Sequence, residues 1–402
     1  MVSASGVRPE QFPVTRKCPF LPPAEYGEIR EREPIAKVSL VEGQWAWAIT
    51  RHEDVRAVLV DPRFSSDRDD PNYPRLVPGS RPRAGQKTLT TMDAPEHGVA
   101  RRAVLGEFTV RRTEALRPRV QAIVDERIDA IVAGPQPADL VRDLALPVPS
   151  LVICELLGVP YDDHEFFQGH TSTMVDMMSS AEQRQGAFAA ITGYLDELVT
   201  LKEKAPDHED LLGRQIIGGR ADGTHRHEAL VAMAFLLLAA GHETTANMIS
   251  LSAVALLENP DQLAAIRADQ AKTLPAVEEL LRYFTVVDSH IARVAVEDVE
   301  LGGVTIRAGE GVLGLLLAAN RDPEAFDDPD VLDVGRGARH HVAFGFGPHQ
   351  CLGQNLARME LQVVIDTLFR RIPGIALAKP VEELDFKDTA VIYGLHSLPI
   401  TW

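Results

Sequence analysis

The stretch that most constrains this chain is Phe344 to Gly353, FGFGPHQCLG, where a glycine-rich loop carries Cys351 and leads into a helix. Three of its ten residues are glycine, so the backbone can adopt positive φ angles and approach a flat ligand closely. Apolar residues then recur at helical spacing; they are Leu352, Leu356, Met359 and Val363. The free N–H groups and the dipole at such a helix start favour a thiolate. An anionic sulfur beside a glycine platform can ligate a metal or act as a nucleophile.

A free cysteine is more often a small buried hydrophobe than a functional group, and the residues around Cys351 decide between these interpretations. With 14 Phe, 29 Gly and 3 Cys in 402 residues, the pattern F-x-x-G-x-x-x-C-x-G would arise by chance roughly five times in ten thousand. It resembles the haem-binding loop of the cytochrome P-450 monooxygenases, in which a cysteine thiolate is the axial ligand of haem iron. The resemblance implies haem b (iron protoporphyrin IX) as the cofactor and Cys351 as the ligand of its iron. It also implies that Phe344 shields the sulfur and that Gly345 and Gly353 contact the cofactor.

Composition narrows the class of protein. The 3 cysteines are widely spaced and odd in number, which argues against a disulfide framework and for a reducing compartment. A net charge of −17 argues against a nucleic-acid partner. The start of the chain is polar, and the longest uninterrupted apolar run, Ala229 to Gly241, is too short to span a bilayer. We therefore expect a protein of the cytoplasm without a membrane segment. No Ser/Gly-rich linker divides the chain, which predicts one domain over residues 1–402.

The first part of the chain predicts a small β-rich lobe. Ile35–Leu40 and Trp45–Thr50 alternate around Glu42-Gly43, which predicts a hairpin, and a short helix is expected from about His52 to Val60. Residues 65–91 carry four prolines and little apolar periodicity. Loops this long are often functional, and the resembled family places this one over the substrate. A disordered connector is the alternative.

The segment MDAPEHGVARR, Met92 to Arg102, predicts a helix start with a proline in its first turn. His97 and Arg101 then stand at i and i+4 on one face. They can be an ordinary solvated pair, but the same spacing matches the family residues that hold a haem propionate, since a guanidinium suits a carboxylate. By the same resemblance, Arg293 in HIARVA and His349 also bind propionates.

Further helices are expected at Val110–Ala133 and Leu146–Leu157, with Cys154 as core filler. A soft apolar set follows that suits either a core or a substrate roof; it comprises Phe166, Phe167, Met174, Val175, Met177 and Met178. The strand-like segments Thr285–Ile291 and Val391–Leu395 match family segments that line the substrate cavity. They supply four further candidate substrate contacts, Val286, Val287, Val391 and Ile392.

The longest helical pattern, Ala229–Leu251, contains AGHETT from Ala240 to Thr245. A carboxylate and two threonines inside an apolar helix are poorly explained as core alone. The hydroxyl of Thr244 can bond to the carbonyl of Ala240 and open a kink or groove. The resembled family carries this motif over its oxygen site. The resemblance implies that Ala240 contacts the haem and that Glu243 and Thr244 deliver protons there; His242 is expected to be structural.

A weaker motif completes the order of the family motifs. Glu279 and Arg282 form E-x-x-R, which by itself occurs in many helices, and Arg336 matches the family's third partner in this network. Leu332 departs from the phenylalanine common there. With these motifs the resemblance covers essentially the whole chain. It implies a mostly α fold, the cytochrome P-450 fold, with a large helical part and a small β-rich lobe from residues 35–50 and later strands.

The resemblance implies a monooxygenase that inserts one atom of O2 into a C–H bond of a hydrophobic small molecule such as a macrolide, a steroid-like compound or a xenobiotic. Electrons would come from NAD(P)H through a ferredoxin reductase and a ferredoxin. Six arginines are expected to form a basic docking patch; they are Arg101, Arg102, Arg111, Arg112, Arg339 and Arg358. The alternatives are a nitric oxide reductase of the same fold, which takes electrons directly from a nicotinamide, and a haem gas sensor. Glu243 and Thr244 argue against both.

Overall fold

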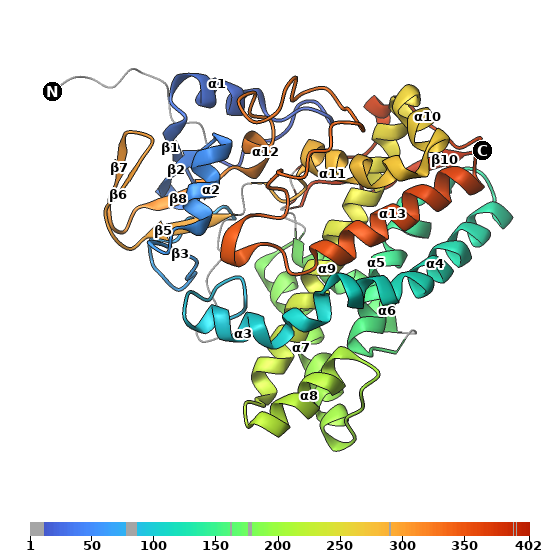
Figure 1. Cartoon of the computed structure of the whole chain (residues 1–402), viewed down its shortest axis with the longest axis horizontal. Helices are drawn as coiled ribbons and strands as arrows, with labels where there is room; N and C mark the ends of the chain where they lie inside the picture. The colour runs from blue at the N-terminus through green and yellow to red at the C-terminus, as the bar shows by residue number, and fades with distance from the viewer. Residues whose placement is uncertain are drawn as a thin grey trace.

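The structure is a computed structural model and describes residues 12–77, 87–160, 163–175, 179–288, 291–388, 390 and 392–402, without the side chains of His164 and Val175. Most of it is helical, and a smaller sheet region occupies one end of the molecule (Figure 1). The helices are α1 Ala24–Arg32, α2 His52–Val60, α3 Glu96–Leu105, α4 Val110–Ala133, α5 Pro147–Leu157, α6 His164–Val175, α7 Ala181–Lys204, α8 Leu211–Asp222, α9 His227–Glu258, α10 Pro260–Ala268, α11 Thr273–Phe284, α12 Leu316–Ala319 and α13 Gln354–Arg371.

The strands are short and gather in three sheets. They are β1 Ile35–Ser39, β2 Trp45–Ile49, β3 Phe64–Ser65, β4 Ala138–Asp139, β5 Ala292–Ala295, β6 Val299–Leu301, β7 Val304–Ile306, β8 Gly311–Gly314, β9 Ala376–Leu377 and β10 Pro399–Thr401. The largest sheet has the order β1-β2-β8-β5-β3, with β6 and β7 as a separate pair and β4-β10-β9 as the third sheet. The predicted hairpin is confirmed, because β1 and β2 pair antiparallel with Ile35 opposite Ile49.

Helix α9 is the centre of the helical part. Its side chains are apolar on nearly every face, which is typical of a helix surrounded by protein. It packs against α5, α7, α11 and α13, and α13 packs in turn along α4. Buried side chains from α4, α5, α9, α11 and α13 belong to one continuous apolar core. Two smaller clusters fill the space around the largest sheet.

Helix α9 is also long and apolar enough to cross a membrane by length and composition, although half of its most apolar window is buried inside the protein. The sequence did not predict a helix of this length and hydrophobicity. The uninterrupted apolar run ends at Gly241, whereas the helix continues through His242 and Glu243. A core helix of a soluble protein meets the same criterion. The partial burial is consistent with that role.

The predicted helices at 52–60 and 110–133 match α2 and α4 to the residue. Two strand predictions are wrong. In the described part of 285–291 there is no strand: α11 ends at Phe284, its C-cap Thr285 has a positive φ of 42°, and β5 begins only at Ala292. In the second segment, Leu395 forms an isolated bridge with Phe386, and the described residues before it are not in a strand. Extended, apolar sequence without a partner strand remains loop, because strand pairing supplies the backbone hydrogen bonds.

Candidate active site

The loop before α13 presents Cys351 at the end of a tight path. Gly345 and Gly347 adopt positive φ angles of 69° and 73°, which glycine reaches without a steric penalty. A Cβ on Gly347 would lie 2.9 Å from the carbonyl oxygen of Leu59, so the loop packs closely against the end of α2. The N–H of Cys351 donates to the carbonyl of Phe344 at 2.8 Å. Helix α13 starts three residues later, with Gly353 as its N-cap.

The Cys351 side chain is exposed, yet burial among protein atoms is the largest influence on its thiol and raises its pKa. The N–H of Gly353, followed by Arg101 and Arg358, acts in the opposite direction. The helix start thus favours a thiolate, as expected, but without a bound metal the cost of burying the charge is larger. A metal ligated by the sulfur would reverse the balance, since a coordinating thiol loses its proton.

Four groups that can carry positive charge meet near the loop. His97 and Arg101 come from α3, Arg293 from β5, and His349 from the cysteine loop. The rings of His97 and His349 stack with their centroids 4.0 Å apart. Arg101 Nη2 donates to the carbonyl of Gln350 at 2.5 Å, so α3 is attached to the residue before the cysteine.

The protonated forms of these four groups are disfavoured in the structure. Burial lowers the pKa of Arg101 and of Arg293. Burial also lowers the pKa of His97, with Arg101 as the next cause. Burial, then Arg293 and His97, lowers the pKa of His349 to about 4. Groups that repel one another's charge in this way would be stabilised by an anion placed among them.

The residues present fit the two propionates of a haem. The carboxylate of Asp93 lies near the cluster but already accepts from the Ser65 hydroxyl and from the Ser66 N–H, the latter at 2.8 Å. The Nε2 atom of His97 is buried and has no hydrogen-bond partner among the described residues. Two carboxylates entering this cluster would supply that partner and balance the cations. The site therefore fits a flat cofactor that carries two carboxylates for this cluster and a metal for Cys351.

The oxygen-site motif on α9 begins at a residue that solvent can reach. Ala240 is exposed and Gly241 half-buried, although Leu238 and His242 on either side are buried. The Thr244 hydroxyl donates to the Ala240 carbonyl at 2.7 Å, as expected, and the helix continues through this point. Glu243 does not share this surface: its side chain is 1% exposed and forms an ion pair with Lys387. The structure thus separates the two residues that the sequence had placed together in a proton relay.

The structure describes part of the predicted substrate contacts. Met174 is half-buried and packs against the main core. The backbone N–H of Tyr393 donates to the carbonyl of Val286 at 3.1 Å, so the segments around Val286 and Ile392 lie side by side. Val287 is half-buried, while Ile392 is 8% exposed. Val391, Met177, Met178 and the Val175 side chain lie outside the described residues.

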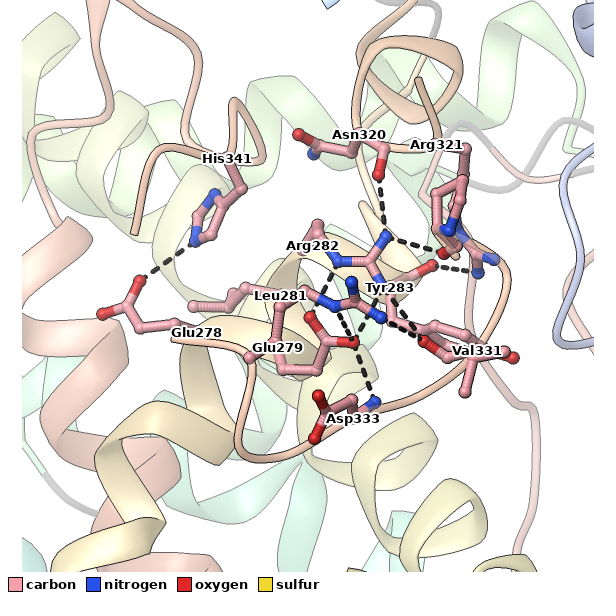
Figure 2. Close-up of polar contacts among 12 residues, drawn as sticks. Glu278, Glu279, Leu281, Arg282, Tyr283, Asn320, Arg321, Val331, Asp333 and His341 are labelled. Atoms are coloured by element: carbon pink, nitrogen blue, oxygen red, sulfur yellow. Dashed lines mark hydrogen bonds and ion pairs between the residues drawn. The ribbon is translucent and has the colours of Figure 1, made fainter. Parts of the chain in front are cut away.

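Figure 2 shows the E-x-x-R network, whose central pair, Glu279 and Arg282, is buried. Arg282 holds Glu279 through two hydrogen bonds of 2.7 Å, with both side chains 0% exposed. Its remaining N–H groups reach the backbone carbonyls of Asn320, Pro329 and Val331. Arg336 Nε donates to Glu279 at 3.2 Å, as the sequence predicted. Leu332 is buried beside this network without disturbing it.

Glu278, the residue before Glu279 on α11, ties the helix to the cysteine region. Its carboxylate bonds to His341 Nε2 at 3.1 Å and to Arg358 Nε at 2.6 Å. Burial acts to raise its pKa, but these two partners outweigh burial and hold the pKa at about 2. The Arg358 guanidinium also lies 4.6 Å from the centre of the Phe344 ring. Helix α13 and the start of the cysteine loop are therefore braced against α11.

The predicted basic patch rests on six arginines, which differ in their exposure. Four of the six arginines are exposed: Arg102, Arg111, Arg112 and Arg339. Arg101 points to the cysteine loop, and Arg358 is engaged by Glu278. Sequence reasoning also missed Lys387, Asn247 and Gly394 around Glu243. Nothing in DFKDT distinguishes this lysine from a surface residue, and it lies 144 residues from its partner.

Comparisons with known proteins agree over almost the full length. Residues 34–372 match the family model described as Cytochrome P-450. Cytochrome P-450-SU2 of Streptomyces griseolus is 49% identical over 386 residues, covering 96% of this chain and 94% of that protein. The crystal structure of cytochrome P-450 MoxA from Nonomuraea recticatena, a CYP105 enzyme, is 57% identical, with a TM-score of 0.91 and 98% of each chain covered. The mycinamicin VIII C21 methyl hydroxylase MycCI from Micromonospora griseorubida, solved with mycinamicin VIII, has a TM-score of 0.93 at 40% identity, covering 98% of this chain and 100% of that one.

Proposed function

This chain belongs to the cytochrome P-450 family, whose members are oxygen-incorporating oxidoreductases, and from that premise we propose that it hydroxylates a hydrophobic small molecule. One atom of O2 enters a C–H bond and the other leaves as water. The observation that carries the proposal is that Cys351, an exposed cysteine on the glycine-rich loop, lies next to the cluster of His97, Arg101, Arg293 and His349. Natural products are the favoured substrates, because a relative of the same fold is named as a hydroxylase of mycinamicin VIII.

The cofactor is haem, and we assign the form haem b. When bound, it supplies the iron that activates dioxygen. The Cys351 thiolate would hold the iron, while the N–H of Gly353 and the ring of Phe344 protect and tune the sulfur. His97, Arg101, Arg293 and His349 would hold the two propionates. Gly345 and Ala240, which offer little side-chain bulk, would leave room for the flat ring on its two sides.

Protons would have to reach the oxygen site through the chain's own groups, because a bound hydrophobic substrate and the apolar helix α9 would exclude bulk water. Thr244 can donate and accept at once, and its hydroxyl stands beside the exposed Ala240. In the structure it donates to the Ala240 carbonyl, so it must turn to pass a proton onward. Glu243 would supply protons to Thr244 only after leaving its buried ion pair with Lys387.

Substrate and electron donor meet the protein on different sides. Met174, Val287 and Ile392 contribute apolar surface suited to a hydrophobic substrate. Electrons from NAD(P)H would arrive through a ferredoxin reductase and a ferredoxin in the cytoplasm. The exposed arginines Arg102, Arg111, Arg112 and Arg339 offer positive charge to an acidic ferredoxin.

The proposal is tested by reconstitution with ferredoxin, its reductase, NADPH and a natural-product library. Product that carries one atom from ¹⁸O2 supports it. The reduced carbonyl complex should show the red-shifted Soret band of thiolate ligation, and Cys351→His should lose that band. Retention of the band in Cys351→His contradicts the ligand assignment. Nitric oxide reduction driven directly by NADH, or gas binding without turnover of any compound, would favour the two alternative functions.

A further inference from the structure

The carboxylate of Glu243 is held away from Thr244. Glu243 Oε1 pairs with the Lys387 ammonium and accepts from Asn247 Nδ2 at 3.3 Å, one turn further along α9. Thr244 reaches back one turn instead, to Ala240. The two side chains therefore extend in opposite directions along the helix. The other oxygen, Glu243 Oε2, is buried and has no partner among the described residues.

Lys387 is placed by a loop near the C-terminus. Its backbone N–H donates to the carbonyl of Gly394 at 2.9 Å, and the bridge between Phe386 and Leu395 closes the loop beneath it. The lysine side chain is only 10% exposed and also donates to Asn247 Oδ1 at 3.2 Å. Lysine side chains are seldom buried without a partner. The carboxylate of Glu243 is the partner that allows Lys387 to be buried.

Gly394 supplies the space that this arrangement needs. A Cβ on Gly394 would lie 1.9 Å from Asn247 Oδ1 and 2.8 Å from Asn247 Cβ, a distance at which atoms cannot coexist. The loop can therefore approach α9 only with glycine at this position. Lys387 and Asn247 contact Glu243 directly, and Gly394 packs against Asn247.

The charge balance around Glu243 depends on this loop. Among the described residues, the charged or titratable groups that face it are Lys387 from the loop and His242 from its own helix. Burial, the largest influence, acts to raise the pKa of Glu243, but Lys387, His242 and Asn247 outweigh it and hold the pKa below its ordinary value. His242 is itself buried, with Nδ1 bonded to the Thr171 hydroxyl at 3.0 Å, and burial lowers its pKa. A neutral imidazole leaves Lys387 as the cation that keeps Glu243 ionised.

We propose that Lys387 is a positioning residue for proton delivery: it holds Glu243 ionised and turned away from Thr244, so protons pass only when this ion pair opens toward the described segments 385–388 and 392–396 of the loop. On the outer side of that loop, Asp385, Asp388 and His396 are exposed, and they give solvent protons a place to enter. This inference rests on the proposed function, because the relay has a purpose only in a monooxygenase.

The first test reads the resting protein and needs no turnover. Infrared spectra of the wild type and Glu243→Gln should not differ in the absorption of a protonated carboxyl group at neutral pH. The same comparison made in a Lys387→Met background should show the loss of one protonated carboxyl group. A protonated carboxyl in the wild-type comparison, or none in the Lys387→Met comparison, overturns the proposal.

The second test uses the pH profile of product formed per NADPH consumed. Lys387→Met should shift the profile to higher pH, because Glu243 then keeps its proton longer, while Lys387→Arg should restore the wild-type profile. Lys379→Met, which changes an exposed lysine nearby in the sequence, is the matched control. A Lys387→Met profile that superimposes on the wild type, at equal haem content, contradicts the proposal.

Gly394→Ala disturbs the contact between Lys387 and Glu243 through Asn247. It replaces Lys387→Met in the second test if Lys387→Met does not fold. Its added Cβ must displace Asn247 or the loop, so the profile should shift in the same direction; an unchanged profile counts against the inference. The two hypotheses remain distinguishable. A wild type that forms no product refutes the proposed function, whereas the infrared comparison still decides whether Lys387 controls Glu243.

Discussion

Single residues inside the core are where pH should act on stability. Glu360 on α13 is 3% exposed, its Oε2 has no partner among the described residues, and burial raises its pKa to about 8. An unfolded glutamate ionises near pH 4.5. Between these values the folded state keeps a proton that the unfolded state has lost, so the free energy of unfolding falls as pH rises, by about 1.4 kcal/mol per pH unit from this group.

Glu360→Gln should remove the pH dependence that Glu360 gives to the free energy of unfolding. The difference between this variant and the wild type should therefore shift in favour of the variant as the pH rises from 5 to 8. Denaturant unfolding at several pH values measures it. Glu382→Gln, at an exposed position, is the control and should leave the slope unchanged. A wild-type slope that persists in Glu360→Gln would show that the carboxylate finds a partner or water in solution.

Thr244 offers a second prediction at this scale. Thr244→Ala should bind haem and substrate nearly as the wild type does, yet much of the NADPH consumed should yield peroxide in place of product, because the hydroxyl that passes protons is gone. Thr244→Ser keeps the hydroxyl and should recover coupling. If serine and alanine give the same product per NADPH, the side chain shapes the helix and does not relay protons.

At the scale of elements, α3 should anchor the cofactor. Arg101 bonds to the backbone next to Cys351 and faces the proposed propionate cluster. Loss of a charged hydrogen bond typically costs about 1.5 to 3 kcal/mol, so Arg101→Ala should lose haem faster, by roughly tenfold or more, than Arg112→Ala on the exposed face of α4. The rate of haem transfer to apomyoglobin measures this. Equal rates would remove Arg101 from the propionate site.

Elements also show how far the sequence could be followed. Helices such as α2 and α4 were predictable because each keeps its own period and its own end signals. The pair of Glu279 with Arg282 was predictable because its members lie one turn apart. Strands at 285–291 and 391–395 were not, since a strand exists only with a partner. The ion pair of Glu243 with Lys387 joins a helix to a distant loop, and no local pattern encodes such a contact.

For the whole molecule, the prediction concerns the electron donor. The net charge is −17, but Arg102, Arg111, Arg112 and Arg339 are exposed and would attract an acidic ferredoxin locally. Reduction by ferredoxin should slow as ionic strength rises, because salt screens such attraction within about 10 Å at 0.1 M. Reduction by dithionite is the control. A rate with ferredoxin that does not change with salt would place docking on other contacts.

That residues 1–402 act as a single domain stays a prediction.

The parallel pairing of β2 with β8 also sets an order in which the protein can be assembled. It joins Trp47 to Val312, and the cysteine loop rests against the end of α2 through Gly347. A ribosome delivers the N-terminal part first, so β1 and β2 can form their hairpin early and must then wait for residues near 312 before the sheet is complete. The cysteine loop is made later still. The compartment around Cys351 therefore closes near the end of synthesis, and the haem has to enter a polypeptide whose helical part is already largely in place.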